Sequence, residues 1–223
     1  MTITIDELCE RLGITQAISE EEYPKYKRAA VPYDLQAKWY DRRSLPSTKA
    51  VASIVCEQLQ GVETAVELGA GTGFRVLYYA INNPTTTFLA IDNDRNATEQ
   101  LKERIRKLRV PNLRVQTGDM YGLKEKYAAI LAIDCFFYPS EDNAIIQWGA
   151  SCMHFGRLVD TSKNKSFLCV PFYDQLGSSY GMTELYAAQV FQEVGLGQLE
   201  TVPFEFVQRD GAYWNGKMLL AKP

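Results

Sequence analysis

Three glycines at alternate positions, Gly69, Gly71 and Gly73, mark the part of the chain best suited to hold a ligand. An apolar run at 65–68 precedes this glycine turn (residues 69–73) and a helical pattern follows it, so the turn joins a strand to a helix. Glycine accepts positive φ angles and lets another group approach the backbone closely. The first N–H groups of the following helix can bind an anionic or polar group. We therefore predict a ligand-binding turn.

Acidic residues follow the strands that come next. Asp92, Asp119 and Asp134 each follow one of the three apolar runs after the glycine turn. The carboxyl ends of parallel strands meet at one edge of a sheet, where ligands bind. We expect these acids to form one polar site beside the turn. Asp92 lies 23 residues beyond Gly69, where an acid can accept hydrogen bonds from both ribose hydroxyls.

A glycine turn with a ribose-binding acid suits two classes of ligand. A dinucleotide needs the pattern G-x-G-x-x-G, with its pyrophosphate at the helix N-terminus. Here the glycines run G-x-G-x-G, and Phe74 stands where the third glycine belongs. A pyrophosphate would also face the negative charges of Glu67, Asp119 and Asp134. The sequence favours a ligand that carries positive charge, with a nicotinamide-dependent oxidoreductase as the disfavoured alternative.

Local signals place helices near the N-terminus. Thr4 and Glu7 have the spacing of a capping box and predict a helix over 5–12, ended by Gly13. Pro46 predicts the start of another helix, which runs to about residue 60. The segment 20–45 is dense in aromatic and charged residues. We interpret residues 1–46 as an N-terminal cap or lid, and residues 47–223 as one domain.

Strands and helices alternate through the rest of the chain. This alternation predicts a parallel sheet covered by helices on both faces. Two final strands, 199–208 and 212–221, are joined by residues 209–211 alone and must form an antiparallel hairpin. Asn215-Gly216 is a competing turn. The earlier strands are predicted at 65–68, 87–91, 113–115, 128–133 and 167–170, and the helices at 73–81, 95–108, 141–153 and 182–194.

The composition narrows the function classes. The 223 residues carry a net charge of −3, unlike proteins that bind nucleic acid by neutralising phosphates. We interpret the basic stretch 101–109 as the solvated face of an amphipathic helix. The sequence has no signal-peptide pattern, no apolar run of membrane-spanning length and no C-x-x-C pair among its five cysteines. We expect a cytoplasmic protein with reduced thiols and without a metal, membrane or nucleic-acid partner.

Four stretches of the chain carry a family resemblance. VELGAGTG, AIDND, TGDMYGL and AILAIDCFFYP resemble, in this order, the motifs of the class I S-adenosylmethionine-dependent methyltransferases, and the closing hairpin resembles that family's last two strands. The resemblance covers roughly residues 47–223. It implies an α/β fold with a Rossmann-like, doubly wound sheet of seven strands. It also implies S-adenosylmethionine as methyl donor and S-adenosylhomocysteine as product.

The resemblance assigns roles to the strand ends. The glycine turn, including Ala70, would wrap the methionine part of the cofactor, with Glu67 supporting the turn. Asp92 would hold the ribose hydroxyls, although Asp92 or Asp94 could instead cap the 95–108 helix. Asp119 could alternatively serve only to form a turn with Gly118. The remaining cofactor-side residues are Asn93, Asp119 and Met120 at the adenine and Asp134 beyond the fourth strand.

The residues around the acceptor end favour an amine. Methyl transfer from a sulfonium is an in-line displacement, so an amine must lose its proton before attack. A carboxylate such as Asp134 attracts a cationic amine and can relay that proton, while each aromatic face adds a cation–π contact of ~0.5–2 kcal/mol. We predict N-methylation of a small amine or guanidine-type compound. The acceptor-side candidates are Tyr33, Trp39, Tyr40, Phe137, Tyr138, Phe172 and Tyr173, and Asp134 and Tyr138 are the catalytic ones.

Two other functions stay open. His154, the single histidine, could be the base of a small-molecule O-methyltransferase, although a lone histidine near a helix C-terminus is often a capping contact. A non-catalytic, cofactor-binding regulatory protein is the alternative of another class. The sequence Asp134-Cys135-Phe136-Phe137 departs from the Asn/Asp-Pro-Pro-Tyr/Phe signature of members that methylate nucleic acids or protein amides. This departure argues against those acceptors.

Overall fold

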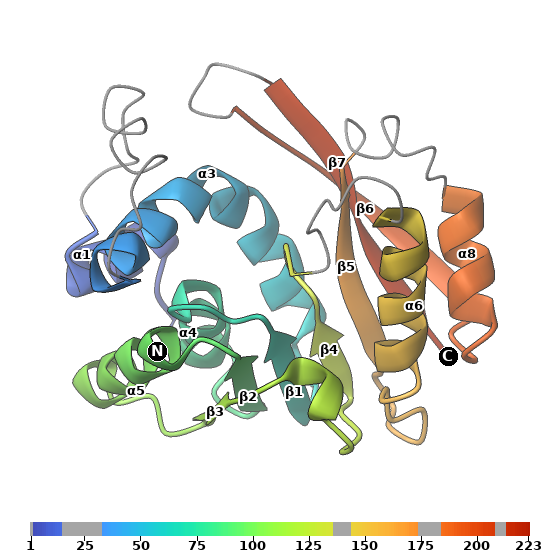
Figure 1. Ribbon diagram of the computed structural model, residues 1–223, viewed down its shortest axis with the longest axis horizontal. Helices are drawn as coiled ribbons and strands as arrows, with labels where there is room; N and C mark the ends of the chain where they lie inside the picture. The colour runs from blue at the N-terminus through green and yellow to red at the C-terminus, as the bar shows by residue number, and fades with distance from the viewer. Residues whose placement is uncertain (1, 15–32, 136–143, 174–183, 208–212) are drawn as a thin grey trace.

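The computed structural model of the chain describes residues 2–14, 33–135, 144–173, 184–207 and 213–223 (Figure 1). For residues 33–40, 43, 144, 145 and 173 the description covers the backbone alone. The statements below refer to these residues.

One seven-stranded sheet forms the centre of the described chain. Across the sheet the strands follow the order β3-β2-β1-β4-β5-β7-β6. Pairing is parallel from β3 to β5, and β7 runs antiparallel to both β5 and β6. The predicted parallel sheet with a C-terminal antiparallel hairpin is confirmed. The strands are β1 (Thr64–Leu68), β2 (Thr87–Asp92), β3 (Leu113–Thr117), β4 (Ala129–Leu131), β5 (Phe167–Tyr173), β6 (Gln198–Val207) and β7 (Tyr213–Lys222).

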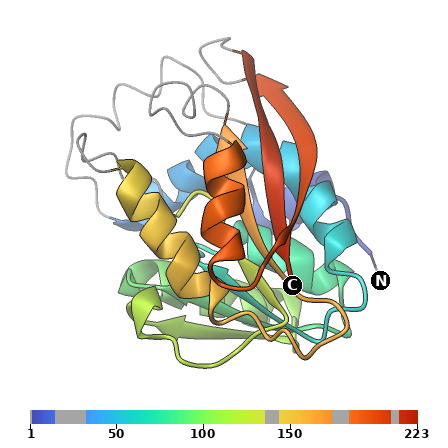
Figure 2. The same cartoon turned by 90° about the vertical axis from the view of Figure 1, so that its right-hand side faces the viewer.

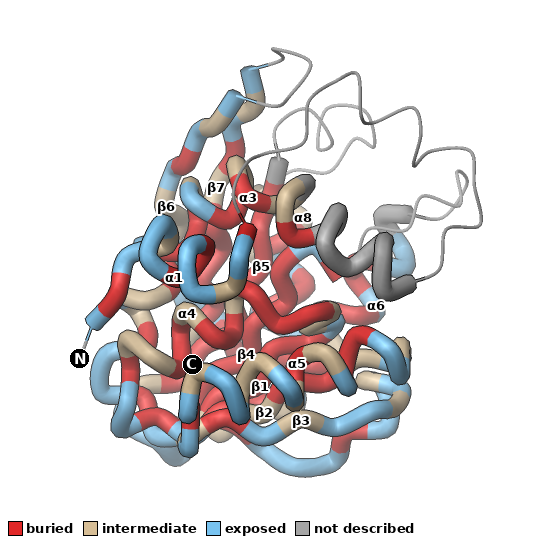
Figure 3. Tube along the Cα trace, turned by 90° about the vertical axis from the view of Figure 1, so that its left-hand side faces the viewer, coloured by how far each residue is buried: buried red, intermediate tan, exposed pale blue. Residues whose placement is uncertain are grey.

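Helices cover both faces of the sheet (Figures 1 and 2). One face carries α1 (Ile5–Leu12), α3 (Tyr33–Gln58), α4 (Phe74–Asn82) and α5 (Arg95–Leu108), and the other carries α6 (Ala144–Gly156) and α8 (Glu184–Gln192). Successive side chains of a strand point to opposite faces, so Ala65 and Val66 in β1 belong to two different apolar cores. Figure 3 shows the buried stretches running through the strands and the inner faces of the helices.

The strand order creates a switch point at β1. From β1 the chain crosses to β2 on one side, and β4 pairs with β1 on the other side. Ligands of open α/β sheets bind beyond the carboxyl ends of the strands at such a point. The glycine turn follows β1 directly and therefore lies at this position.

The first helix has the predicted ends. Thr4 Oγ1 accepts a hydrogen bond from the Glu7 N–H at 3.1 Å, and the Glu7 carboxylate accepts one from the Thr4 N–H at 2.6 Å. Gly13 ends the helix with a φ angle of 72°. These caps satisfy backbone groups that helix ends leave unpaired.

The predicted helix start at Pro46 is wrong. Helix α3 begins at Tyr33 and runs through Pro46, so it also crosses the boundary expected between the cap and the main domain. Proline inside a helix removes one N–H donor and favours a kink, and Figure 1 shows α3 arching over the sheet. The side chains of Leu45 and Thr48 are buried on either side of the proline. Tertiary packing thus holds the helix together across a residue that local sequence places at a helix start.

The C-terminal hairpin is long and rises above the rest of the sheet in Figure 1. Asn215 pairs with Glu205 and Gly216 with Phe204 inside the ladder of β6 and β7. The competing turn at Asn215-Gly216 is therefore wrong, because it would interrupt this pairing. The predicted turn at residues 209–211 lies outside the described residues.

The structure also bears on the cysteines and on membrane insertion. All five cysteines are free; Cys56 is half-buried and the others are buried. No described helix combines the length and apolar character that a membrane-spanning segment needs.

Gly73 provides a test of the packing between α4 and α5. It has a φ angle of 76°, and an added Cβ would lie 2.1 Å from Cδ1 of the fully buried Leu101. Overpacking and the left-handed backbone should together make the unfolding free energy of Gly73→Ala about 2–4 kcal/mol lower than that of the wild type. Urea denaturation followed by circular dichroism measures this difference. Gly197→Ala, at an exposed site with no neighbouring atom within 4 Å, should change it by less than about 0.5 kcal/mol. Equal stability of the two variants would contradict the observed packing.

Candidate functional site

The glycine turn joins β1 to α4 in left-handed backbone conformations. Gly69, at φ 60°, packs closely against Cys135, which follows β4. A Cβ added at Gly69 would lie 2.7 Å from Cys135 Cβ. Gly71, at φ 55°, would place a Cβ where no described atom lies within 4 Å. The turn therefore packs against the sheet at Gly69 and leaves its backbone open to a ligand at Gly71.

Asp92, the last residue of β2, holds the glycine turn by hydrogen bonds. Its Oδ2 accepts from the Gly71 N–H at 2.7 Å, and its Oδ1 accepts from the Asp94 N–H at 2.8 Å. Asp94, rather than Asp92, caps α5, because its Oδ1 accepts from the N–H groups of Asn96 and Ala97. A carboxylate offers about four acceptor positions. Asp92 can therefore support the turn and accept further hydrogen bonds from a ligand.

Glu67 is a buried carboxyl that precedes the glycine turn. Its side chain is 3% exposed, and its Oε2 has no hydrogen-bond partner among the described residues. Burial is the main cause that raises its pKa from 4.5 to about 8; Arg75 lowers the pKa, and Asp134 and Asp92 raise it. A buried polar oxygen without a partner is costly. Glu67 is thus suited to accept a hydrogen bond from a ligand or to lie beside a positively charged group of it.

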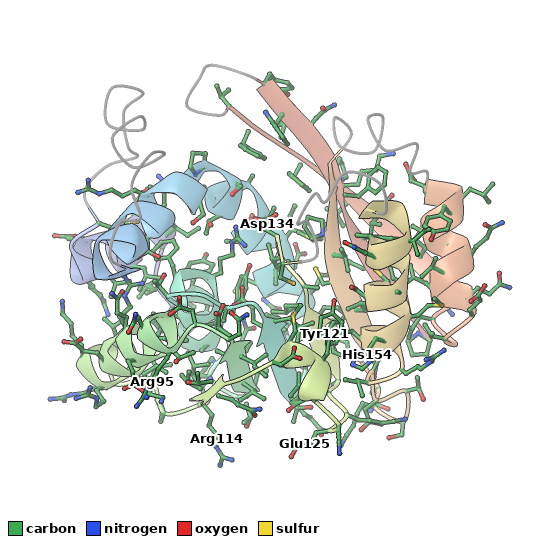
Figure 4. The ribbon with its side chains drawn as sticks, viewed as in Figure 1. Arg95, Arg114, Tyr121, Glu125, Asp134 and His154 are labelled. Carbon is green, nitrogen blue, oxygen red and sulfur yellow. The ribbon has the colours of Figure 1, made fainter. Side chains whose placement is uncertain are left out.

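Asp134 lies just beyond the end of β4 (Figure 4). Its φ angle of 59° is in the left-handed region, where Asp and Asn are enriched among non-glycine residues. Arg75 in α4 donates from Nη2 to Asp134 Oδ2 at 2.5 Å and from Nη1 to the Ile133 carbonyl at 3.2 Å. Arg75 Nε also donates to Thr48 Oγ1 in α3 at 3.1 Å. Arg75 thereby joins the end of β4 to α3, while 35% of the Asp134 side chain stays exposed.

Asp119, Met120 and Asn93 follow the carboxyl ends of β3 and β2. Asp119 is exposed, and its Oδ1 accepts from the Tyr121 N–H at 3.0 Å at the start of the short 3-10 helix η1 (Met120–Gly122). This is the turn-forming role that competes with ligand binding, but a carboxylate retains acceptor capacity beyond one bond. Met120 is half-buried and Asn93 is exposed.

His154 lies near the C-terminal end of α6, beside Tyr121 and apart from Asp134 (Figure 4). Its ring centroid is 5.4 Å from that of Tyr121 and 4.9 Å from that of Phe155. His154 Nε2 is buried and has no hydrogen-bond partner among the described residues. Within the same residues, no group of three His, Cys, Asp or Glu side chains could hold a metal ion. The structure therefore brings His154 together with aromatic rings and not with the acids.

The predicted acceptor side is described only in part. Phe172 is buried in the apolar core that contains residues of α6 and α8. The side chain of Phe172 thus packs in the core. Residues 137 and 138 lie outside the described residues, and for three positions in α3 and one in β5 only the backbone is described. The candidates without a described side chain are Tyr33, Trp39, Tyr40, Phe137, Tyr138 and Tyr173.

Asp41, Thr72 and Arg104 form a buried triad at the glycine turn, and no sequence motif links them. The Asp41 carboxylate, 2% exposed, accepts hydrogen bonds from Thr72 Oγ1 and from Arg104 Nη2, the latter at 2.5 Å. Arg104 Nη1 donates to the Thr72 carbonyl at 3.0 Å. Arg104 is therefore an exception to the predicted solvated face of 101–109, since 14% of its side chain is exposed. Its spacing of three residues from the buried Leu101 is the sequence signal for this placement.

The sequence of the site matches a known family model. Residues 62–137 match the model described as "Putative methyltransferase". This segment contains the glycine turn together with Asp92, Asp119 and Asp134. No curated protein sequence matches the chain.

Solved structures, methyltransferases among them, share the fold. Magnesium protoporphyrin IX methyltransferase (ChlM) from Synechocystis PCC 6803, with bound S-adenosylmethionine, aligns with a TM-score of 0.61 and 15% identity over 92% of this chain and 93% of that one. An S-adenosylmethionine-dependent methyltransferase from Aquifex aeolicus aligns with a TM-score of 0.56 and 16% identity over 83% of this chain and 97% of that one. EvdMO1 aligns with a TM-score of 0.56 and 15% identity over 77% of this chain, and the alignment covers 40% of EvdMO1. At these identities the comparisons establish the fold, and the predicted Rossmann-like architecture is confirmed.

The buried Glu67 makes the stability of the unliganded protein depend on pH. Between its ordinary pKa of 4.5 and its folded-state pKa of about 8, the folded state holds one proton more than the unfolded state. Stability from this group is therefore present below pH 4.5 and falls as the pH rises toward 8, by up to ~1.4 kcal/mol per pH unit. As the pH rises from about 5.5 to about 7.5, the unfolding free energy of Glu67→Gln should therefore increase by ~2–3 kcal/mol relative to that of the wild type. Urea unfolding at each pH measures this difference.

The control for this experiment is Glu103→Gln, which changes an exposed carboxyl on α5. It should leave the pH dependence of the wild type unchanged. A Glu67→Gln curve that runs parallel to the wild-type curve would contradict the description of Glu67 as a buried, protonated group.

Proposed function

We propose that this chain, a class I S-adenosylmethionine-dependent methyltransferase, transfers the methyl group to the nitrogen of a small-molecule amine or guanidine. The transfer is an in-line displacement at a sulfonium carbon. The protein contributes alignment and exclusion of water, which together can be worth ~7–11 kcal/mol when the reacting groups are well oriented.

The geometry of the glycine turn supports the placement of the donor. The methionine part lies along residues 69–73, including Ala70, where the backbone of Gly71 is open. Glu67 faces the positive charge of the donor, and Asp92 accepts from the ribose hydroxyls while it holds the turn. Asn93, Asp119 and Met120 line the adenine side, at the ends of β2 and β3.

The observation that carries the choice of acceptor is the position of Asp134. Its carboxylate lies beyond the end of β4, partly exposed and oriented by Arg75. A protonated amine is attracted to such a carboxylate and must give up its proton before it attacks. Asp134 is therefore the residue proposed to bind the amine and relay its proton, with Tyr138 as a further candidate at this end.

O-methylation with His154 as the base is the competing proposal. The unpaired Nε2 atom of His154 is the observation in its favour. Against it, the ring packs on Tyr121 and Phe155 near the end of α6. A base must lie within hydrogen-bond reach of the proton that it removes. A purely regulatory, cofactor-binding role would require no acceptor.

Incubation with methyl-labelled S-adenosylmethionine tests the reaction class. We expect label on primary or secondary amines or on guanidines in an acceptor panel, and none on phenols or carboxylates. Asp92→Ala, which lacks the proposed ribose contact, should transfer no label. Label on phenols alone would favour the His154 proposal, and binding without any label would favour the regulatory role. S-adenosylhomocysteine, but not NAD, should raise the melting temperature of the wild type.

Substitutions at Asp134 and His154 distinguish the two catalytic proposals. Asp134→Asn should lower kcat about a hundredfold, because it removes the proton acceptor, with little change in affinity for S-adenosylhomocysteine. Asn also accepts the left-handed backbone of this position. His154→Gln should keep kcat within about twofold of the wild type. The reverse pattern would contradict the amine proposal. Both values come from steady-state kinetics with the best acceptor of the panel.

A further inference from the structure

The glycine turn is held by side chains from the sheet and from two helices. On the sheet side, Asp92 accepts the Gly71 N–H. On the helix side, Arg104 donates to the carbonyl of the next residue, Thr72, whose hydroxyl donates to Asp41. These hydrogen bonds come from β2, from α5, which follows β2 directly, and from α3, which lies far away in the sequence. Charged side chains thus fix two peptide groups of the turn, the one with the Gly71 N–H and the one with the Thr72 carbonyl.

The buried ion pair is not explained by stability alone. Asp41 is 2% and Arg104 14% exposed, so both charges have lost most of their water. Apolar side chains of similar volume usually hold two helices together as well as a buried ion pair does. They could not, however, donate to the Thr72 carbonyl and accept from its hydroxyl. The property that requires the charged pair is therefore its contact with the turn.

We propose that Asp41 and Arg104 are positioning residues for the cofactor: they hold Thr72 so that the neighbouring backbone of Gly71 keeps the shape that binds the donor. Arg104 presents its fork of N–H groups to two acceptors at once, the Asp41 carboxylate and the Thr72 carbonyl. The inference rests on the proposed function, because it names the ligand of the turn as the donor. The holding of the turn itself is independent of that ligand.

The triad also makes α3 part of the cofactor site. Asp41 stands on the same continuous helix as residues 33–40, which include Tyr33, Trp39 and Tyr40. A second contact, from Arg75 to Thr48, fixes α3 to α4 seven residues further along. Coupling between two sites is reciprocal. The contact of α3 with Thr72 shapes the turn, so a cofactor bound to the turn also stabilises that contact. Ligand binding at α3 and cofactor binding at the turn are therefore linked.

Three variants test the role of the triad. Thr72→Val removes one hydrogen bond and keeps the size of the side chain, while Asp41→Asn/Arg104→Gln removes both charges together and so leaves no unpaired buried charge. Glu99→Gln/Lys102→Gln is the matched control, because it neutralises the exposed ion pair on the same helix. Each is compared with the wild type by calorimetric titration with S-adenosylhomocysteine and by hydrogen exchange of residues 69–76 without ligand.

We expect the Asp41→Asn/Arg104→Gln variant to bind S-adenosylhomocysteine at least tenfold more weakly and Thr72→Val about three- to tenfold more weakly, with folded circular dichroism spectra. Exchange at residues 69–76 should be faster in both variants and unchanged in the control. Binding within twofold of the wild type in both folded variants overturns the inference. If the wild type does not bind S-adenosylhomocysteine, the proposed function fails. Hydrogen exchange at residues 69–76 then decides whether the triad holds the turn. Exchange rates in both variants equal to those of the wild type would overturn the claim that the triad holds the turn.

Discussion

The structure depends on a short stretch of backbone that is held in left-handed conformations between β1 and α4. Such conformations cost L residues roughly 1–2 kcal/mol each, and glycine avoids that cost. Glycine also leaves the chain loose, so the shape of the turn has to be fixed from outside. Asp92 fixes the Gly71 N–H from the sheet, and Arg104 fixes the Thr72 carbonyl from the helices.

Charge at the carboxyl edge of the sheet is the second constraint. Glu67, Asp92 and Asp134 lie near enough to one another that the two aspartates raise the pKa of the buried Glu67, and Arg75 compensates in part. Water is excluded from Glu67, so these charges are screened weakly. A ligand that brings positive charge relieves this arrangement, whereas a pyrophosphate would intensify it. The acids that favour the proposed sulfonium donor are the same ones that support the proposed cationic acceptor next to it.

Much of the fold could be predicted because local patterns and tertiary packing agree. The capping box at Thr4 and the alternation of strands and helices each have one compatible structure, and the structure has it. The antiparallel pairing expected for the last two strands is also present. Pro46 is the exception, because burial of Leu45 and Thr48 holds α3 together across a residue that usually begins or interrupts a helix. Asn215-Gly216 likewise has the composition of a turn, but the ladder with β6 continues through it.

The sequence by itself determined which backbone segments and which acids belong to the candidate site. The spacing of the glycines and the position of Asp92, Asp119 and Asp134 after consecutive strands follow from short-range order along the chain. Only the tertiary structure decided that Asp41 and Arg104, 63 residues apart, meet at Thr72, and that His154 packs on Tyr121. Contacts of this kind depend on how separate helices dock, and no local pattern encodes that. The turn can therefore be recognised in the sequence, but its support has to be seen in three dimensions.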